Sequence, residues 1–458
     1  MDEKIRIMSE ERISKALLKF AIPAIIGLLI TAIYNFVDAI FVGGLGTSAM
    51  GAAAIAFPIS MVIVGLGLTL GSGASSYISR LLGKEDMELA NRTASTAVFS
   101  SIFLGIIVIV PSLIFLQPLL RSFGATDTIL PFAKDYSYIF IGGSIFSVIN
   151  ITMNNIVRAE GAAKISMKAL MVGAILNIIL DPIFIYSFGL GIKGAAIATV
   201  ISQVVSMILL LTFFSSDKSS IKISAKYFTL SKEIMLEILK IGMPSLVFQI
   251  LSSASMGLIN SAAVPYGDAA VAAMGIVNRI FAIGSYVIFG FSKGFQPIAG
   301  YNYGAKKYSR LKELINISLR WTTGFCLSLA VIQIIFASPI VSIFSDDPLV
   351  LKIGARALRA YSMMFPFFGF QMIYMTLFLA LGKAREGGVL SLGRQGMFLI
   401  PTVLILPRII GLDGVLFSQA IADFLTTLLT VFFSVKLNDK ISSLLEAIPT
   451  NANIKKIG

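Results

Sequence analysis

Runs of about 20 apolar residues recur along the chain, and they constrain its fold more than any other feature. Each run is long enough to cross a hydrocarbon core of about 30 Å as a helix. The sequence therefore predicts an all-α membrane protein with twelve transmembrane helices. A β-barrel is excluded, because barrel strands are only about ten residues long and alternate in polarity with period two. The expected spans are residues 16–42, 51–78, 94–117, 134–157, 166–188, 194–214, 237–264, 270–298, 315–337, 354–380, 389–410 and 414–436.

The charge distribution indicates how the chain is oriented. Only 13% of the 458 residues are charged, whereas a soluble domain carries about 25%. The net charge of +13 does not indicate a nucleic-acid partner, because lysines and arginines cluster before the first span and after each even-numbered span. The positive-inside rule then places both termini in the cytoplasm. We expect a multi-pass protein of the cytoplasmic membrane whose charged N-terminal lead precedes an uncleaved first span.

Two residue types narrow the chemistry. Histidine is absent, and Cys326 is the only cysteine. These counts exclude a histidine-based triad, a zinc site and an internal disulfide. Any proton chemistry near neutral pH must therefore use carboxylates.

The two halves of the chain share glycine and proline positions at a constant shift of 221 residues, as from Pro23 to Pro244 and from Gly161 to Gly382. Six spans in each half start both halves on the same side of the membrane, which predicts two pseudo-twofold-related six-helix lobes around a central cavity. Coincident glycines and prolines in membrane helices are the alternative explanation. The predicted segments are an N-terminal tail (1–15), an N-lobe (16–214), a cytoplasmic linker (215–236), a C-lobe (237–436) and a C-terminal tail (437–458).

Asp38 and Asp181 stand inside long apolar stretches of the first half. A carboxylate within a membrane span costs about 2.5 to 3.5 kcal/mol, so such a residue usually faces a polar cavity. Counted along their helices, both lie roughly 6 to 12 Å below the outer surface of the hydrocarbon core. The shift of 221 pairs them with Ile259 and Thr402, so the two acids belong to one lobe only.

Three further polar residues are expected beside these acids. Tyr34 and Asn177 each precede an aspartate by four residues and share its helical face, and Thr199 enters the sixth span at a similar depth. Such oxygen-rich clusters suit Na⁺ or a shared proton, and the sequence leaves that choice open. A hydrogen-bonded network that only fixes two helices together is the alternative. Pro23 either couples this site to bending of the first span or is a passive kink.

The segments "NFVDAIFVGGLG", "MNNIVRAEG" and "NIILDPIFIYSFGLGIKGAAIATVIS", together with the repeat, resemble the multidrug and toxic compound extrusion (MATE) family of cation-coupled efflux transporters. The resemblance runs from Ile13 to Lys436. It implies export of drugs and lipophilic cations in exchange for Na⁺ or H⁺. It implies cation ligands at Asp38, Asn177, Asp181 and Thr199. It also assigns Tyr34, Asn154 and Pro23 to the surrounding polar network and the bend of the first span.

The second half departs from the family pattern. Some family members carry acids in spans 7 and 10, and this chain has none there, which argues against a carboxylate mechanism in the C-lobe. Asp423 is the one acid well within a span of this half, where it either lines a substrate cavity or hydrogen-bonds a neighbouring helix. The candidate cavity residues are Asp423, Gln249, Met256, Tyr361 and Met372.

We therefore expect a monomeric secondary active multidrug efflux transporter, without enzymatic activity and without a cofactor beyond the coupling ion. One rival is a lipid-linked precursor flippase, which needs a basic cavity; Arg279 is expected to be the only arginine deep in a span. Another rival is an intramembrane enzyme that uses Asp38 and Asp181 as an acid–base dyad.

Overall fold

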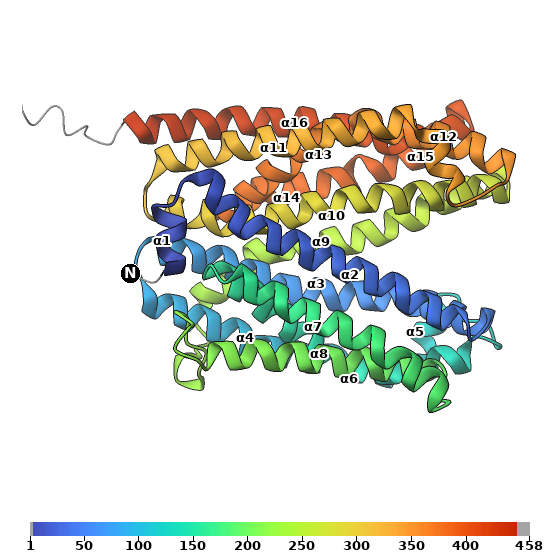
Figure 1. The fold of residues 1–458 in the computed structure, drawn as a ribbon, viewed down its shortest axis with the longest axis horizontal. Coiled ribbons are helices and arrows are strands. Elements are labelled where there is room, and N and C mark those ends of the chain that lie inside the picture. Colours follow the sequence, from blue (N-terminus) through green and yellow to red (C-terminus); the bar gives the residue numbers. More distant parts are fainter. Residues whose placement is uncertain (1–2, 447–458) are drawn as a thin grey trace, which may run out of the picture.

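The computed structural model describes residues 3–446 as helices that run side by side along the long axis of the molecule (Figure 1). Twelve of these helices are long and apolar enough to cross a membrane. A helix satisfies its backbone hydrogen bonds within one segment, as a hydrocarbon environment requires. The predicted all-α membrane fold with twelve spans is thereby confirmed.

The spans follow one another through short connections. The first six are α2 (Ile13–Gly43), α3 (Thr47–Gly83), α4 (Met87–Ile114), α6 (Leu130–Ala159), α7 (Ala163–Pro182) with the π-helical turn η1 (Ile183–Ser187), and α8 (Ile192–Phe214). The last six are α9 (Lys232–Ala263) with η3 (Val264–Tyr266), α10 (Asp268–Gly304), α11 (Tyr308–Ile335), α13 (Pro348–Ala380), α14 (Ala384–Leu392) with η4 (Gly393–Met397) and α15 (Leu399–Ile410), and α16 (Leu412–Glu446). Shorter elements are α1 (Glu3–Ser9), α5 (Leu116–Ser122), η2 (Ala225–Tyr227) and α12 (Ala337–Ser342).

The backbone φ angles of the two halves also show the internal repeat. Gly46 and Gly267 both have a positive φ, at 104° and 90°. Glu85 and Lys306, also 221 residues apart, have φ values of 62° and 56°. A positive φ is uncommon for a residue other than glycine, so its recurrence at equivalent positions indicates that the two halves share one local fold.

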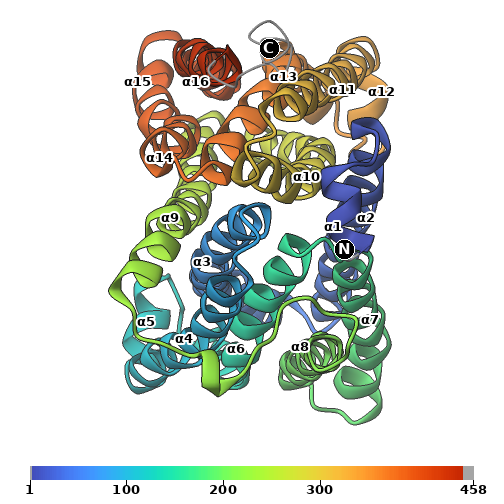
Figure 2. The ribbon, with the colours of Figure 1, turned by 90° about the vertical axis from the view of Figure 1, so that its left-hand side faces the viewer.

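The two halves form separate lobes. Seen from one end of the bundle, α3, α4, α6, α7 and α8 gather in the lower part of the view and α10, α11, α13, α14, α15 and α16 in the upper part, with α2 and α9 at the boundary (Figure 2). At the boundary α2 packs against α10, and α3 packs against α9. These two helix pairs exchange under the repeat, as pseudo-twofold-related lobes require.

The lobes touch backbone to backbone at one end of the bundle. A Cβ atom added at Gly83 would lie 2.1 Å from the carbonyl oxygen of Tyr301, and one added at Gly304 would lie 2.1 Å from that of Arg80. The two contacts exchange under the shift of 221. Only glycine allows so close an approach. We call this end of the bundle, which carries α1, the terminal face, and the opposite end the far face.

Helix α1 lies across the boundary between the lobes on the terminal face (Figure 2). The Lys4 ammonium forms an ion pair of 3.0 Å with Glu160, in the α6–α7 connection of the N-lobe. On the C-lobe side, the Asn302 amide donates to the Met8 carbonyl at 3.1 Å, and the Arg310 guanidinium donates to the Glu11 carbonyl at 2.7 Å. The N-terminal segment therefore contacts both lobes at once.

Most helices extend beyond the spans expected from hydropathy, and two of them reach into the expected linker and tail. Helix α9 begins at Lys232, inside the segment expected as the linker 215–236, after Ser231 accepts the N–H of Ile234. Helix α16 continues to Glu446, into the expected tail 437–458, of which residues 447–458 lie outside the described residues. Hydropathy detects the part of a helix that suits lipid, and it misses polar turns that continue the same helix into water.

Candidate functional site

The first acid of the N-lobe lies near the far end of α2. Asp38 precedes the last residue of that helix, Gly43, by five residues, and its side chain is half-buried. Its Oδ1 atom is buried and accepts no hydrogen bond from any described residue. The carboxyl group is therefore held in place without an internal donor for that oxygen.

The second acid is supplied by α7. Asp181 is fully buried, and its Oδ1 accepts a hydrogen bond of 3.2 Å from the Asn177 amide one turn earlier. The same amide lies 3.5 Å from the Thr199 hydroxyl on α8. Pro182 follows directly and cannot donate to Ile178, and the helix widens into the π-helical turn η1. Such π-helical turns occur frequently at functional sites.

The two acids face each other across α2 and α7. Their carboxyl groups lie within hydrogen-bonding reach. Besides Asp38 Oδ1, the buried Asp181 Oδ2 and Asn177 Oδ1 also have no donor among the described residues. Three acceptor oxygens thus lie together, and no described residue donates a hydrogen bond to any of them. Two carboxylates this close cannot both stay ionised cheaply, so the site favours a bound cation or a shared proton.

Two phenols border this cluster. Tyr34 on α2 and Tyr136 on α6 are close enough for the charges of both carboxylates to act on them. Tyr136 is half-buried and stacks on Phe140 with ring centroids 5.5 Å apart. The helical spacing identified Tyr34, whereas Tyr136 has no acid on its own helix face to reveal it. Only the packing of α6 beside the two acids brings it to the site.

Asn154 does not join this cluster. It lies near the terminal end of α6, where its Oδ1 accepts a hydrogen bond of 2.7 Å from Ser166 and a further bond from the Arg158 guanidinium. The structure therefore separates Asn154 from Asp38 and Asp181, with which the family resemblance grouped it. Its direct partner is a buried arginine that sequence reasoning did not single out.

Pro23 is buried within α2, which continues as one helix from Ile13 to Gly43. The helix is in close contact with the C-lobe at this point, since a Cβ added at Gly294 would lie 2.6 Å from the Cα of Ala21. Pro23 thus lies at the boundary between the lobes, more than three turns from Asp38.

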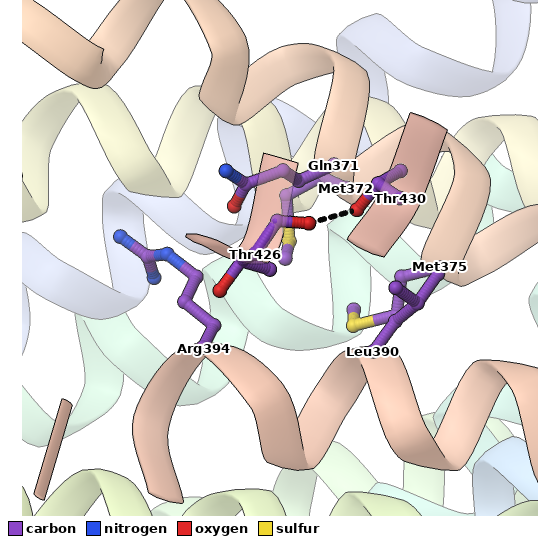
Figure 3. Close-up of a pocket in the computed structure, with 7 residues that line it drawn as sticks. All are labelled: Gln371, Met372, Met375, Leu390, Arg394, Thr426 and Thr430. Atoms are coloured by element: carbon purple, nitrogen blue, oxygen red, sulfur yellow. Dashed lines mark hydrogen bonds between the residues drawn. The ribbon is translucent and has the colours of Figure 1, made fainter. Parts of the chain in front are cut away.

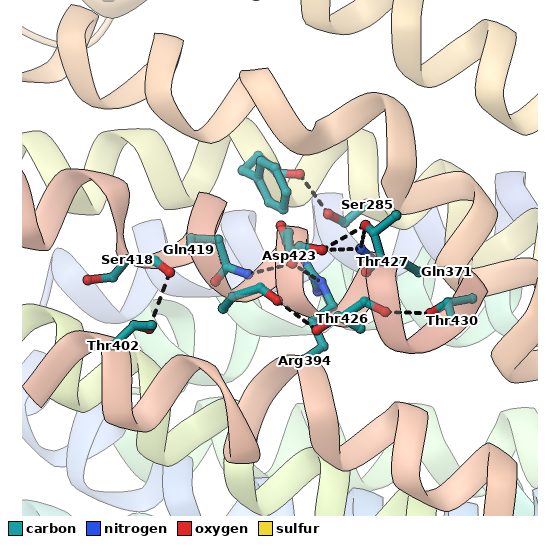
Figure 4. A network of polar contacts seen from close by, with 12 residues as sticks. Ser285, Gln371, Arg394, Thr402, Ser418, Gln419, Asp423, Thr426, Thr427 and Thr430 are labelled. Atoms are coloured by element: carbon teal, nitrogen blue, oxygen red, sulfur yellow. Dashed lines mark hydrogen bonds and ion pairs between the residues drawn. The ribbon is translucent and has the colours of Figure 1, made fainter. Parts of the chain in front are cut away.

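The C-lobe contains a different polar cluster (Figure 4). Asp423 on α16 is 1% exposed and forms an ion pair of 2.8 Å with Arg394 on η4. Its Oδ1 also accepts the Gln419 amide at 3.0 Å, and its backbone carbonyl accepts the Gln371 amide at 2.8 Å. Arg394 further lies 4.4 Å from the ring centroid of Phe368. Of the two roles expected for Asp423, the structure shows the hydrogen bond to a neighbouring helix.

The interior of the C-lobe is tightly packed around this pair. A small hollow beside Arg394 is too narrow to admit a water molecule (Figure 3). Tyr361 and Met372 are each 2% exposed. By contrast, Gln249 lies at the boundary between the lobes, 3.9 Å from the sulfur of Met61, and Met256 is 45% exposed. The five cavity candidates therefore do not line one common space.

The prediction that Arg279 is the only arginine deep in a span is wrong. Arg279 is exposed on α10, whereas Arg158 and Arg394 are buried at 9% and 4% exposure. Both lie inside helices long enough to span the membrane, and so does Lys293 on α10. All three basic residues stand in apolar stretches of the sequence. Their burial depends on which helix face each one occupies.

Two pseudo-twofold-related lobes of helices long enough to cross a membrane, with acids within those helices, define a polytopic membrane transporter. The MatE family model matches residues 23–183 and again 244–405, once in each lobe. The chain therefore belongs to the MatE family, which confirms the resemblance found in the sequence. Members of this family are transporters, so the chain is not an enzyme.

Relatives and solved structures agree with this assignment over nearly the whole chain. "Multidrug export protein MepA" of Staphylococcus aureus is 29% identical over 449 residues, covering 96% of this chain and 98% of the relative. The protein of that name from Staphylococcus saprophyticus is 28% identical over 442 residues, with the same two coverages.

Two solved structures, both 28% identical, have the same fold. The first, "Outward-facing conformation of a multidrug resistance MATE family transporter of the MOP superfamily", has a TM-score of 0.90 and covers 97% of this chain and 99% of its own. The second has a TM-score of 0.89 and covers 96% of this chain and 98% of its own. It is described as "Reverse polarity of binding pocket suggests different function of a MOP superfamily transporter from Pyrococcus furiosus Vc1 (DSM3638)".

Proposed function

We propose that this chain is a secondary active multidrug efflux transporter that exports amphipathic, cationic small molecules in exchange for Na⁺ or H⁺. The observation that carries the proposal is the pair of facing carboxyl groups of Asp38 and Asp181, whose free oxygens have no donor among the described residues. The multidrug export proteins named above are similar over almost their full length, which supports efflux of drugs.

The coupling ion binds at the N-lobe cluster of Asp38, Asn177, Asp181 and Thr199. Residues 3–446 contain no group of three or more acidic, histidine or cysteine side chains that could hold a metal, so this cluster has only two carboxylates. Two acids with neutral amide and hydroxyl oxygens suit a monovalent cation or a proton better than a divalent ion. Ion binding and drug binding must favour different conformations, because otherwise one gradient could not drive the other.

The transporter works by alternating access between its two lobes, and residues 16–214 and 237–436 move as the two units. Both termini are cytoplasmic by the positive-inside rule, which makes the terminal face the cytoplasmic one. The backbone contacts at Gly83 and Gly304 close that face, which supports an outward-facing state of the cycle. Pro23, at the lobe boundary, supplies the bending point that links the acid cluster to lobe movement.

The cellular setting follows from the same arguments. The protein acts as a monomer in the cytoplasmic membrane, with lipid and small-molecule drugs as its partners and no cofactor beyond the coupling ion. Its basic loops serve orientation, so nucleic acid is not a partner.

The test is efflux of a fluorescent lipophilic cation from proteoliposomes under a sodium gradient and, separately, a proton gradient. Wild type is compared with Asp38→Asn and with Asp217→Asn, a matched loss of charge at an exposed linker position. We expect one gradient to drive transport in wild type and Asp217→Asn, and neither to drive it in Asp38→Asn. Undiminished transport by folded Asp38→Asn would refute the coupling role of the acids. No transport by wild type under either gradient would favour the lipid-linked precursor flippase.

A further inference from the structure

Two basic side chains lie near each other on α6 and α10, helices of different lobes that pack together, away from the acid cluster. Arg158 lies at the terminal end of α6 in the N-lobe, and Lys293 lies on α10 in the C-lobe. The charge of Arg158 acts directly on Lys293. Like charges brought together inside membrane-spanning helices are costly, so their pairing calls for a physical reason.

Arg158 is held firmly by neutral groups only. Its Nη1 donates to Asn154 and, at 2.9 Å, to the Ser166 hydroxyl, while its Nη2 donates to Asn155 at 2.8 Å. These bonds fix the plane of the guanidinium without neutralising it. Arginine retains its charge in proteins, so this buried side chain presents a fixed positive charge.

Lys293 has no partner within the described chain. Its ammonium makes neither an ion pair nor a hydrogen bond with any residue of 3–446, and its side chain is only partly buried. Gln296 lies three residues later on the same helical face, and its amide has no hydrogen-bond partner in that part of the chain either. One face of α10 therefore offers an ammonium and an amide to the lobe boundary.

No nearby carboxylate compensates the pair. The Glu160 carboxylate is engaged by Lys4 at 3.0 Å, and Glu237 on α9 is engaged by Arg80 at 3.1 Å. No acid among residues 3–446 forms an ion pair or a hydrogen bond with Arg158 or Lys293. The two cations thus lack an internal counter-charge, which is uncommon for charged side chains removed from water.

The position of the pair ties it to the contact between lobes. A Cβ added at Gly294, next to Lys293, would lie 2.6 Å from the Cα of Ala21 on α2. The α10 backbone is therefore pressed against the N-lobe where its lysine approaches Arg158. An anion held by both side chains would stabilise this closed contact by bridging the lobes.

We propose that Arg158 and Lys293, with the Gln296 amide, form a binding site for a phosphate-type oxyanion. Arginine binds phosphate oxygens through two parallel N–H groups, and lysine adds a point charge. The oxyanion comes either from the headgroup of an amphipathic molecule or from a free anion. This site goes beyond the proposed cation-coupled export, and it rests on that function only for any role in the transport cycle.

The experiment is calorimetric titration of purified full-length protein, in uncharged maltoside micelles, with dodecyl phosphate and separately with inorganic phosphate. We expect wild type to bind dodecyl phosphate and Lys293→Gln to bind it at least about tenfold more weakly. Lys293→Arg, which keeps the charge, should stay within about threefold of wild type. Lys168→Gln removes an exposed lysine of the N-lobe and should bind as wild type does.

The outcomes separate the sources of the anion and the two proposals. Equal affinity for both phosphates identifies a free anion, and a requirement for the alkyl chain identifies a headgroup. Equal binding by wild type and Lys293→Gln, or no binding by wild type, overturns the site. Lys293→Met provides the same comparison if the glutamine variant does not fold. Asp38→Asn should still bind dodecyl phosphate, so failure of the coupling proposal would leave this result unchanged.

Discussion

The two lobes treat their buried acids in opposite ways. In the N-lobe, Asp38 and Asp181 face each other with oxygens that have no donor among the described residues. In the C-lobe, Asp423 is neutralised by Arg394 at 2.8 Å and receives further amide hydrogen bonds. An acid that the protein itself compensates contributes to structure, whereas one left uncompensated is available to a ligand.

Position along the helices sharpens this contrast. Asp38 lies five residues from the far end of α2, or roughly 7 Å, whereas Asp423 lies eleven residues inside α16, or roughly 16 Å. Both clusters adjoin a π-helical turn, η1 after Asp181 and η4 around Arg394. The two turns are not equivalent under the repeat, because a shift of 221 carries η1 to residues 404–408, inside α15.

The largest expected effect is on coupling in the N-lobe. Asp181→Asn replaces an acid with an amide of nearly the same shape, so the cluster loses one of its two ionisable carboxyl groups. We expect gradient-driven efflux to fall to background while the thermal unfolding temperature stays at or above that of wild type, because one repulsive charge is removed. Efflux assays and unfolding in detergent measure the two quantities. A variant that loses stability and retains efflux would reverse the roles assigned to the lobes.

The next effect is on stability in the C-lobe. Arg394→Met leaves Asp423 buried without its partner, which should cost about 3–5 kcal/mol in the free energy of unfolding. Adding Asp423→Leu removes the stranded charge and should recover most of the loss. Denaturant unfolding of the single and double variants in micelles tests this. Equal instability of both would mean that packing, not charge pairing, holds these helices together.

A smaller effect is expected when the same double variant is assayed for transport. Arg394→Met with Asp423→Leu should keep its dependence on the coupling gradient, with rates within about threefold of wild type, since the hollow beside Arg394 is too small for a water molecule and the proposed ion site lies in the N-lobe. The measurement is efflux at several sodium and proton gradients. Complete uncoupling of this folded variant would place part of the ion pathway in the C-lobe.

The smallest effect distinguishes two threonines. Thr199→Val removes one neutral oxygen from the acid cluster and should cost about 1 kcal/mol in ion binding, or about a fivefold rise in the ion concentration for half-maximal transport. Thr402→Val is the matched C-lobe control, because Thr402 donates to the Phe398 carbonyl of its own helix at 2.9 Å. A similar shift in both variants would remove the distinction between the lobes.

Much of the fold could be predicted because its signals are local. Apolar runs determine the spans, and the spacing of glycines determines the repeat. The acid cluster was also accessible, since Asn177 and Asp181 lie one helical turn apart and Thr199 lies at the matching depth. The hydrogen bonds of 3.2 and 3.5 Å join those three residues as the helical spacing implied.

The rest of the site depends on contacts between helices that are distant in sequence. Asp423 and Arg394 are 29 residues apart on different helices, and only their packing makes them an ion pair. Asn154 was assigned by resemblance to the acid network, yet its partner is Arg158 one turn away on its own helix. Lys293 stands in the sequence as a single charge within an apolar run. Its approach to Arg158 arises where two lobes meet, which no single segment encodes.

Helix α1 gives the terminal face an asymmetry that the repeat lacks. The contacts at Gly83 and Gly304 are duplicated by the repeat. The contacts of α1, from Lys4 to Glu160 and from Met8 to Asn302, have no second copy among residues 3–446. Any motion that separates the lobes at this face must break the contacts of α1 with one of the two lobes. The few residues before the first span therefore hold the two lobes together at this face. A bulky fusion at that end would strain the contacts between the lobes at Gly83 and Gly304.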